Sequence, residues 1–420
     1  MKIKAITAYE ILASGGYPSI ECKVELESGA VGIASVPYGA SAGSHEANVL
    51  NDADAARYAG KGMLKAVTNI QQKIAPALMG KDASEQRAID QIMIDLDGTE
   101  NKSHLGGNAI LAVSLSVAKA MAQSKGQELY AYIRDYYQTG VDFSTLPQPM
   151  VVAIEGGKHA HHSTDLQEFC ISAIASNSVT ENIRKVLETY HVLEKILQEN
   201  NLSTNVGNEG AFAPSGIISN ETPLEFIVQA IKKAGYVPGQ DLAISLDAAA
   251  SEFYDAAAGK YNLKLENKIL NSGELSNYYQ GWLGKYPIIT MEDMQAEDDW
   301  AAWTEFKKIC DAKNILLIGD DLTVTNVKRL QMAIDQQAIS AILIKLNQIG
   351  TLTETIDCCL LAKKHGLATI TSHRGGGETN DTSMIDVAVA VGSRFVKVGP
   401  TRGERVAKYN RLMEIERQLA

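Results

Sequence analysis

Six polar residues that each follow a short apolar run have the types and the spacing to share one chemical task. They are Asp247, Glu292, Asp320, Lys345, His373 and Lys397, and successive members lie 45, 28, 25, 28 and 24 residues apart. Four of these five intervals match the length of one strand followed by one helix. Because the carboxyl ends of strands in a parallel barrel converge on one face, the spacing predicts that the six side chains meet in one bowl.

The acids in this set predict a site for a hard divalent cation. Mg²⁺ prefers oxygen ligands and keeps coordination positions open for water and substrate. The pairs Glu292-Asp293 and Asp320-Asp321 each offer two candidates, so the spacing alone leaves the choice within each pair open. The alternative is that one or more of these acids caps a helix or pairs with a lysine.

The two lysines predict a base. Two ammonium groups close to a metal ion repel one another, which lowers a lysine pKa and can leave one amine neutral. A neutral amine facing a metal could remove a proton next to a carboxylate while the ion stabilises the charge that develops. The alternative for Lys345 is a strand end that reaches into water, and the alignment with Lys397 and the acids disfavours it.

Composition limits the classes of function. A chain of 420 residues exceeds the usual size of one hydrophobic core, so two domains are expected. The formal charge of −11 argues against nucleic acid or an anionic membrane as the main partner. None of the five cysteines forms a CxxC pair, which favours a reducing cytoplasm. The start, MKIKAITAYEIL, lacks a signal-peptide core, and no run of about 18 apolar residues occurs, so we expect a soluble, unprocessed chain.

The chain divides into two regions with different sequence patterns. Residues 1–140 begin with SIECKVELESGAVGIASV, whose alternation around a Ser28-Gly29 turn predicts antiparallel strands, and continue with helical stretches such as NAILAVSLSVAKAMAQSKG. Residues 141–420 carry eight apolar runs separated by helical segments, which predicts an α/β barrel. The runs are VVAIEGGKH, STNVGNEG, LAISLD, PIITMED, ILLIGDD, AILIKLN, ATITSHR and RFVKVG.

Several longer motifs resemble segments of the enolase (phosphopyruvate hydratase) family, in the same order. They are MIDLDGTENKSHLGGNAILAVSLSVAKA, LDAAASEFY, MEDMQAEDDWAAW, GDDLTVTN, IKLNQIGTLTETI and ERVAKYNRLMEIE. The resemblance implies a smaller α+β amino-terminal lid domain before an enolase-type (βα)8-like barrel. It also implies that the start of the barrel departs from simple βα repetition, and we expect this irregularity to explain the 45-residue interval.

The resemblance further implies a lyase that interconverts 2-phosphoglycerate and phosphoenolpyruvate with two Mg²⁺ ions. Asp247, Glu292 and Asp320 would hold the first ion, and Ser41 would bind the second ion, which arrives with the substrate. Lys345 would take the C2 proton. A lysine or histidine base with one or two Mg²⁺ ions is the known arrangement of the enolase superfamily itself, and the pairing of acids and amines agrees with it.

Four further positions match catalytic residues of the family. Lys397 would bind and polarise the substrate carboxylate, and Glu209 would act as the acid that assists loss of the C3 hydroxyl. Glu168 would lie beside Glu209, and His159 matches a histidine of a mobile loop.

The phosphate pocket departs from the family pattern. Arg374 matches the phosphate-binding arginine, with His373 beside it and Gln167 also expected at the substrate. SHRGGGETND has Gly375 where the family's SHRSGETED has a serine that helps hold the phosphate, and it has one extra residue in the glycine run. A run of glycines can present backbone N–H groups to an anion; the alternative is a flexible turn.

Other departures lie in the same functional regions. Asn208 stands where the family has Asp, Tyr38 where the lid loop has Ser, and Gly15 where the first domain has Arg. Two rival functions therefore stay open: an enolase-like enzyme acting on a related phosphono or phospho carboxylate, and a non-catalytic enolase-fold binding protein. The expected partners are a small phosphorylated carboxylate and further copies of the chain, in a homodimer or higher homo-oligomer.

Overall fold

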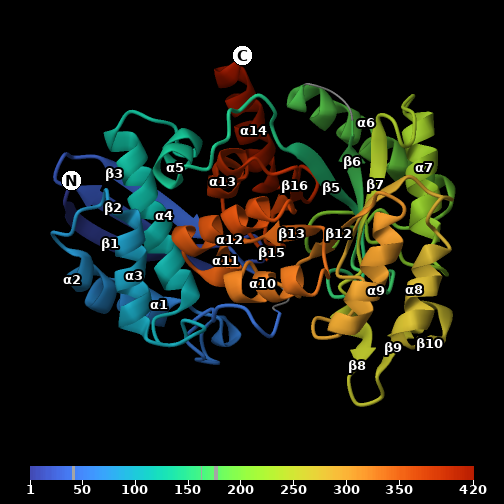
Figure 1. Ribbon diagram of the computed structural model, residues 1–420, viewed down its shortest axis with the longest axis horizontal. Coiled ribbons are helices and arrows are strands. Elements are labelled where there is room, and N and C mark those ends of the chain that lie inside the picture. The colour runs from blue at the N-terminus through green and yellow to red at the C-terminus, as the bar shows by residue number, and fades with distance from the viewer. Residues whose placement is uncertain (40–42, 162, 175–177) are drawn as a thin grey trace.

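The computed structural model describes residues 1–39, 43–161, 163–174 and 178–420. An antiparallel sheet of β1 (Ile3–Leu12), β2 (Pro18–Leu26) and β3 (Val31–Val36) begins the chain. Helices cover this sheet, and they form with it a unit on one side of the molecule (Figure 1). The helices are α1 (Leu64–Asn69), α2 (Ala75–Leu78), α3 (Gln86–Asp97), α4 (Gly107–Ser124) and α5 (Leu129–Tyr137), with a π-helical turn at Ile70–Ile74 between α1 and α2.

Helix α4 lies directly on the sheet because small residues let the two backbones approach. A Cβ atom on Gly32 of β3 would lie 2.0 Å from the carbonyl oxygen of Ser116, so only glycine fits there. The Ser116 hydroxyl donates a hydrogen bond to the carbonyl oxygen of Cys22 in β2 at 2.8 Å. The antiparallel strands and the helix predicted for this part of the chain are therefore confirmed.

The rest of the chain closes into a barrel in the order β11-β12-β13-β14-β16-β5-β6-β7. Strand β6 runs antiparallel to both β5 and β7, and the other neighbours are parallel. The enolase-type barrel with an irregular start is thus confirmed. The strands are β5 (Gln148–Glu155), β6 (Glu168–Ala173), β7 (Leu242–Asp247), β11 (Ile288–Glu292), β12 (Leu316–Gly319), β13 (Ala341–Ile344), β14 (Ala368–Ser372) and β16 (Phe395–Val398).

Helices surround the barrel, and several begin at side-chain caps. Ser178, Asn326 and Thr351 each accept a hydrogen bond from a backbone N–H of the first turn. The helices are α6 (Val179–Glu199), α7 (Thr222–Lys233), α8 (Ser272–Gln280), α9 (Trp300–Asp311), α10 (Val327–Asp335), α11 (Leu346–Ile349), α12 (Leu352–Lys364), α13 (Ser383–Val391) and α14 (Arg405–Leu419).

Two expectations about the barrel are wrong. The run STNVGNEG is not a strand: in this segment only Val206 forms an isolated bridge, to Phe212. The second strand is β6, EFCISA, whose residues are all buried. A short, continuous apolar run of this kind is the signal for a strand covered on both faces.

The 45-residue interval also has a different cause. It contains a small antiparallel sheet of β8 (Tyr254–Asp255), β9 (Lys260–Leu263) and β10 (Lys268–Leu270), inserted between β7 and α8. The irregular start of the barrel lies earlier, at β5 and β6, so it does not lengthen this interval.

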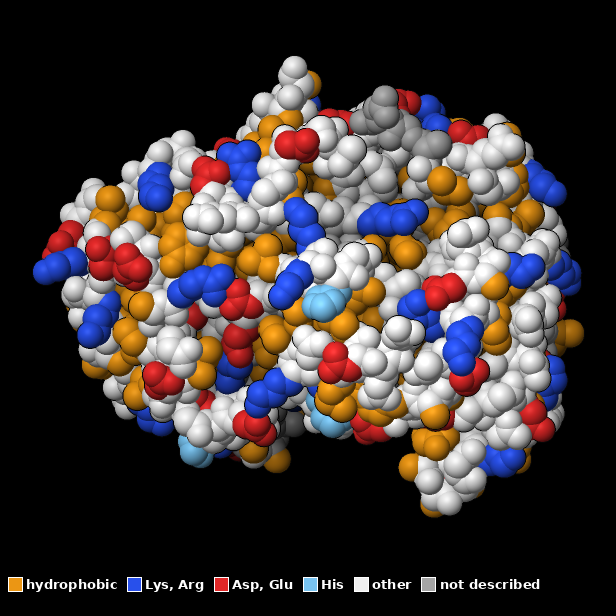
Figure 2. Space-filling view, in the orientation of Figure 1, with side chains coloured by type: hydrophobic (Ala, Val, Ile, Leu, Met, Phe, Trp, Pro, Cys, Tyr) orange, Lys and Arg blue, Asp and Glu red, His pale blue; other side chains and the backbone are white. Residues whose placement is uncertain are grey.

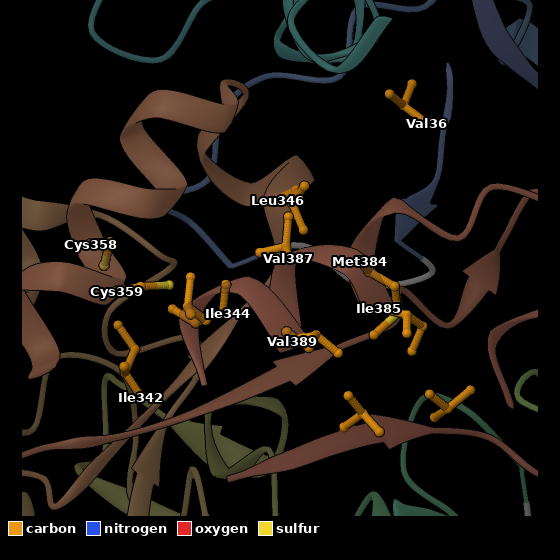
Figure 3. Close-up of a cluster of buried hydrophobic side chains, with 14 of the residues drawn as sticks. Val36, Ile342, Ile344, Leu346, Cys358, Cys359, Met384, Ile385, Val387 and Val389 are labelled. Atoms are coloured by element: carbon orange, nitrogen blue, oxygen red, sulfur yellow. The ribbon is translucent and has the colours of Figure 1, made fainter. Parts of the chain in front are cut away.

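The core of the barrel domain continues between its strands and the outer helices. Figure 3 shows Ile342 and Ile344 of β13 with Cys358 and Cys359 of α12 in one buried cluster. All four residues of β13 are buried, as expected for a parallel strand with both faces covered. On the outer face seen in Figure 2, acidic and basic side chains are interspersed. Across the described ranges, no helix is both long and apolar enough to span a bilayer.

Replacing Ile344 with alanine should destabilise the barrel. The residue is fully buried, so the change removes packed methyl groups and leaves a cavity, at a cost of about 2–5 kcal/mol. The measurement is the midpoint of thermal and urea unfolding. The matched control is Ile269→Ala on β10, where the side chain is 67% exposed and we expect a midpoint close to that of the wild type. Equal shifts for the two variants would contradict the assigned core.

Candidate active site at the barrel mouth

The barrel brings the predicted residues to the carboxyl ends of its strands. Asp247 and Glu292 end β7 and β11 and are paired in the parallel ladder. Asp320 directly follows β12, and Lys345 directly follows β13. Lys397 lies in β16, within hydrogen-bonding distance of Asp247 and Glu292. The convergence predicted from the spacing is therefore present in the structure.

Lys397 is the centre of a buried network of charges. Its ammonium nitrogen lies 2.8 Å from the Glu168 carboxylate, 3.0 Å from that of Asp247 and 2.8 Å from that of Glu292. Burial by itself lowers the pKa of Lys397, but the neighbouring carboxylates raise it well above its usual value. Lys397 is therefore a fixed positive charge, suited to holding an anion rather than to accepting a proton.

Lys345 forms a short ion pair with Asp320. Gln348 donates a second hydrogen bond to Asp320 at 2.8 Å. Burial lowers the pKa of Lys345, but Asp320 outweighs this effect and raises it above the ordinary value. Repulsion from Lys397 does lower this pKa, as expected, but the Asp320 carboxylate is in direct contact and outweighs it.

Glu209 and His373 form a second charged pair. The His373 ring nitrogens lie 3.2 Å from a Glu209 oxygen and 2.7 Å from a Glu378 oxygen. Burial alone would lower the pKa of His373, but Glu378 and Glu209 raise it to about 9. Burial likewise opposes ionisation of Glu209, yet the charge on His373 holds the pKa of Glu209 well below its usual range. Glu209 is therefore a carboxylate beside an imidazolium.

Glu168 is shifted in the opposite direction. Burial and the charge on Glu209 raise the pKa of Glu168 to about 8, so this carboxyl holds a proton at neutral pH. His159 Nδ1 lies 3.5 Å from Glu168 and 3.6 Å from Glu209, and burial lowers the pKa of His159. Two adjacent carboxyl groups with pKa values moved apart can divide acid and base roles between them.

Arg374, which we predicted to bind phosphate, forms an ion pair with a residue of the amino-terminal domain. Arg374 forms a two-pronged pair with Glu46, with N–O distances of 2.7 and 2.9 Å. Sequence reasoning missed Glu46 because no periodic pattern connects the loop before α1 to the barrel. Gln167 lies in the wall of the bowl, and its binding to substrate stays a prediction. Ser41 lies outside the described residues, so its roles at the substrate and at the second Mg²⁺ stay predictions.

Gly375 has a steric role that the sequence did not reveal. A Cβ atom at this position would lie 1.8 Å from Oε1 of Glu209. Any larger residue would therefore push the Glu209 carboxylate away from its present place. Glu378, which orients His373, was also missed, although its place five residues later in the same motif could have suggested it.

The acids at this site fit a divalent cation. Oxygen atoms of Asp293, Asp320 and Asp321 lie within 4.8 Å of one another. Burial and neighbouring negative charge raise the pKa of Glu292 and Asp293 well above normal, and that of Asp321 to about 8. Carboxyl groups that cannot all ionise without further positive charge are a suitable donor set for a hard metal ion.

The three acids predicted to hold the first Mg²⁺ are arranged differently from that cluster. Asp247 and Glu292 contact Lys397, whereas Asp320 contacts Lys345. They nevertheless come from three adjacent strands, β7, β11 and β12. Asp293 instead accepts hydrogen bonds from the backbone N–H groups of Asp320 and Asp321, which fixes the loop after β12.

Comparison with protein families matches both parts of the chain. Residues 3–133 match the family described as "Enolase, N-terminal domain", and residues 143–420 match "Enolase, C-terminal TIM barrel domain". The chain belongs to the enolase family. Membership in this family, together with the lysines and acids at the barrel mouth, supports a lyase of the enolase superfamily.

Binding of Mg²⁺ to this enolase-family site should release protons. Burial and neighbouring negative charge raise the pKa values of Glu292 and Asp293 well above normal and that of Asp321 to about 8, and a metal ion favours the charged forms of all three. We expect about one or two protons released for each ion at pH 7, and fewer as the pH rises above 8. Titration calorimetry in buffers of different ionisation enthalpy measures this number. Heats that do not depend on the buffer at pH 7 would contradict the assignment.

Gly375→Ala should reduce activity without unfolding the protein. The added methyl group displaces the Glu209 carboxylate and separates it from His373. We expect kcat to fall by about 10²-fold, within the range for loss of one acid–base group. Gly273→Ala on α8 is the control, because a Cβ there has only an ordinary contact of 3.4 Å. Full activity in Gly375→Ala would show that the Glu209 position is not needed.

Proposed function

We propose that this enolase-family protein is a Mg²⁺-dependent lyase that interconverts 2-phosphoglycerate and phosphoenolpyruvate. The observation that supports it most strongly is the placement of two lysines and three acids together at the carboxyl ends of the barrel strands. Lys345 pairs with Asp320, and Lys397 contacts both Asp247 and Glu292. A site that must remove a weakly acidic proton next to a carboxylate needs both an amine and strong stabilisation of negative charge.

Mg²⁺ held by Asp247, Glu292 and Asp320 would supply Lewis-acid stabilisation of the charge that develops on the substrate carboxylate. Asp320 would then be shared between the ion and Lys345. Since Asp320 is what raises the pKa of Lys345, sharing it lowers that pKa toward the range of a base. Lys397 stays charged and binds the substrate carboxylate.

The other wall of the bowl supplies the acid. Glu168 holds a proton at neutral pH, because burial and Glu209 raise its pKa to about 8. We propose that the Glu168–Glu209 pair delivers a proton to the leaving C3 hydroxyl, with His373 holding Glu209 ionised. Acid and base assistance contribute about 10²–10⁴-fold each, so charge stabilisation must supply the larger share of catalysis.

A second candidate function is the same elimination on a related phosphono or phospho carboxylate. The observation that favours it is the contact between Gly375 and Glu209. The position that resembles a phosphate-holding serine in other enolases has no side chain here and lies against the Glu209 carboxylate, so the surroundings of the phosphorus group differ from the family pattern. Arg374, moreover, must exchange Glu46 for the substrate anion.

An absorbance assay tests the proposal. Protein with Mg²⁺ and 2-phosphoglycerate should develop the ultraviolet absorbance of the enol phosphate. Lys345→Ala should lower kcat by about 10²–10⁴-fold, because the base is lost. Lys313→Ala, at an exposed turn after α9, is the matched control and should keep full activity.

The remaining results of this assay separate the alternatives. Mg²⁺ binding without turnover of 2-phosphoglycerate would favour a related phosphono or phospho carboxylate. Absence of both would favour a non-catalytic binding protein. The homo-oligomeric state and the cytoplasmic location stay predictions, and sedimentation and fractionation would test them.

A further inference from the structure

Glu155 is a buried acid close to Glu168 and Glu209 that has no part in the chemistry proposed above. It is the last residue of β5, it is fully buried, and it is paired in the barrel ladder with Glu168 of β6. A glutamate is rarely buried to this degree unless a partner neutralises it. A third acid beside two others therefore needs a physical reason.

The Glu155 side chain binds the loop that carries Glu209, residues 207–212. Its Oε2 atom accepts a hydrogen bond from the backbone N–H of Glu209 at 3.1 Å. A Cβ atom on Gly207 would lie 2.5 Å from the Glu155 carboxyl carbon, so glycine at this position leaves room for the contact. The backbone N–H of Glu155 also donates to the carbonyl oxygen of Phe212 at 2.9 Å. Glu155 thus contacts both the middle and the end of this loop.

Two helices hold the same loop from other directions. Arg405 of α14 donates a hydrogen bond to the carbonyl oxygen of Asn208 at 2.9 Å. Tyr190 of α6 donates to the carbonyl oxygen of Gly210 at 3.2 Å, and its ring stacks on Phe212 with the centroids 4.4 Å apart. These contacts fix the neighbours of Glu209, whereas Glu155 fixes the backbone of Glu209 itself.

The surroundings of Glu155 favour its protonated form. Its Oε1 atom is buried and, among the described residues, has no hydrogen-bond partner, which would be costly for a charged carboxylate. Burial and the negative charges of Glu209 and Glu168 raise the pKa of Glu155 to about 9, and the Glu209 N–H and the Arg405 charge oppose this only in part. Tyr190 also faces Glu155, and burial raises the pKa of Tyr190 to about 12, so its hydroxyl stays neutral.

We propose that Glu155 is a positioning residue that binds the Glu209 backbone as a neutral acid and so fixes the Glu209 carboxylate without placing a further negative charge beside it. This inference rests on the proposed function, in which the Glu168–Glu209 pair acts on the leaving hydroxyl. A charged carboxylate at this place would favour protonation of Glu209 and weaken its pairing with His373. The hydrogen bond from Glu209 is therefore what the site needs from Glu155, and a negative charge is not.

Two variants of similar volume test the positioning role. Glu155→Gln keeps a neutral acceptor, so kcat for 2-phosphoglycerate should stay within about twofold of the wild type. Glu155→Met fills the same space with a poor acceptor, so kcat should fall about tenfold or more while KM changes about twofold or less, because Glu209 acts in the transition state. Glu27→Met, at an exposed position after β2, is the control and should keep full activity. A loss of more than about tenfold in Glu155→Gln, or full activity in Glu155→Met, would overturn the inference.

Unfolding by urea at a series of pH values, with Mg²⁺ present throughout, tests the neutral state. Above about pH 5 the unfolded chain ionises Glu155, whereas the folded chain keeps it protonated up to about pH 9, so unfolding releases a proton. The wild type should therefore lose stability relative to Glu155→Gln as the pH rises. We expect the ratio of their unfolding constants to grow about tenfold for each pH unit in this range.

The matched control for this measurement is Glu27→Gln, which changes the same group where it is exposed and should unfold like the wild type at every pH. A ratio between wild type and Glu155→Gln that does not change with pH would show that Glu155 is charged in the folded protein, and would overturn the inference.

The unfolding measurement needs no turnover, so the two proposals can fail separately. If the wild type converts 2-phosphoglycerate and Glu155→Met is equally active, the positioning role fails and the proposed function stands. If the wild type converts no 2-phosphoglycerate, the proposed function fails, and the positioning role that rests on it fails with it. The unfolding data then still decide whether Glu155 is neutral in the folded protein.

Discussion

Repulsion between buried carboxylates at the barrel mouth is the constraint on which the rest of the site depends. Among the described residues there, the acids that are at most 5% exposed include Glu168, Glu209, Asp247, Glu292, Asp293 and Asp320. Burial of so many like charges raises the pKa of several of them, and each lysine is drawn into contact with carboxylates. A metal ion that bound these carboxylates would therefore displace protons and lysine contacts from them.

The same repulsion explains why side chains of the same type differ in protonation at this site. Glu209 is ionised because a doubly paired His373 faces it, whereas Glu168, at the start of β6, keeps a proton. Lys397 and Lys345 are both held positive by acids, so neither behaves as a free amine until the carboxylates find another cation. In this arrangement the roles of acid, base and electrostatic anchor are set by contacts rather than by residue type.

A second coupling links the amino-terminal domain to the barrel. Glu46 forms an ion pair with Arg374, and Tyr38 packs on the glycine run that follows Arg374. The small residues at Gly15, Gly375 and Gly377 are therefore consequences of what lies opposite them. At these positions, a small residue in one segment is matched to a larger group from another segment.

Much of this protein could be predicted from its sequence because periodicity and spacing are local properties. The strands of the first domain, the barrel, and the convergence of Asp247, Asp320 and Lys345 all follow from apolar runs and the intervals between them. The sequence did not reveal that β6 is a strand and STNVGNEG is not, nor which residues share a proton or a charge. Only the tertiary structure decided those points, since the pKa of a buried group depends on neighbours that are distant in the chain, and a glycine's purpose depends on the atom that its missing side chain would have met.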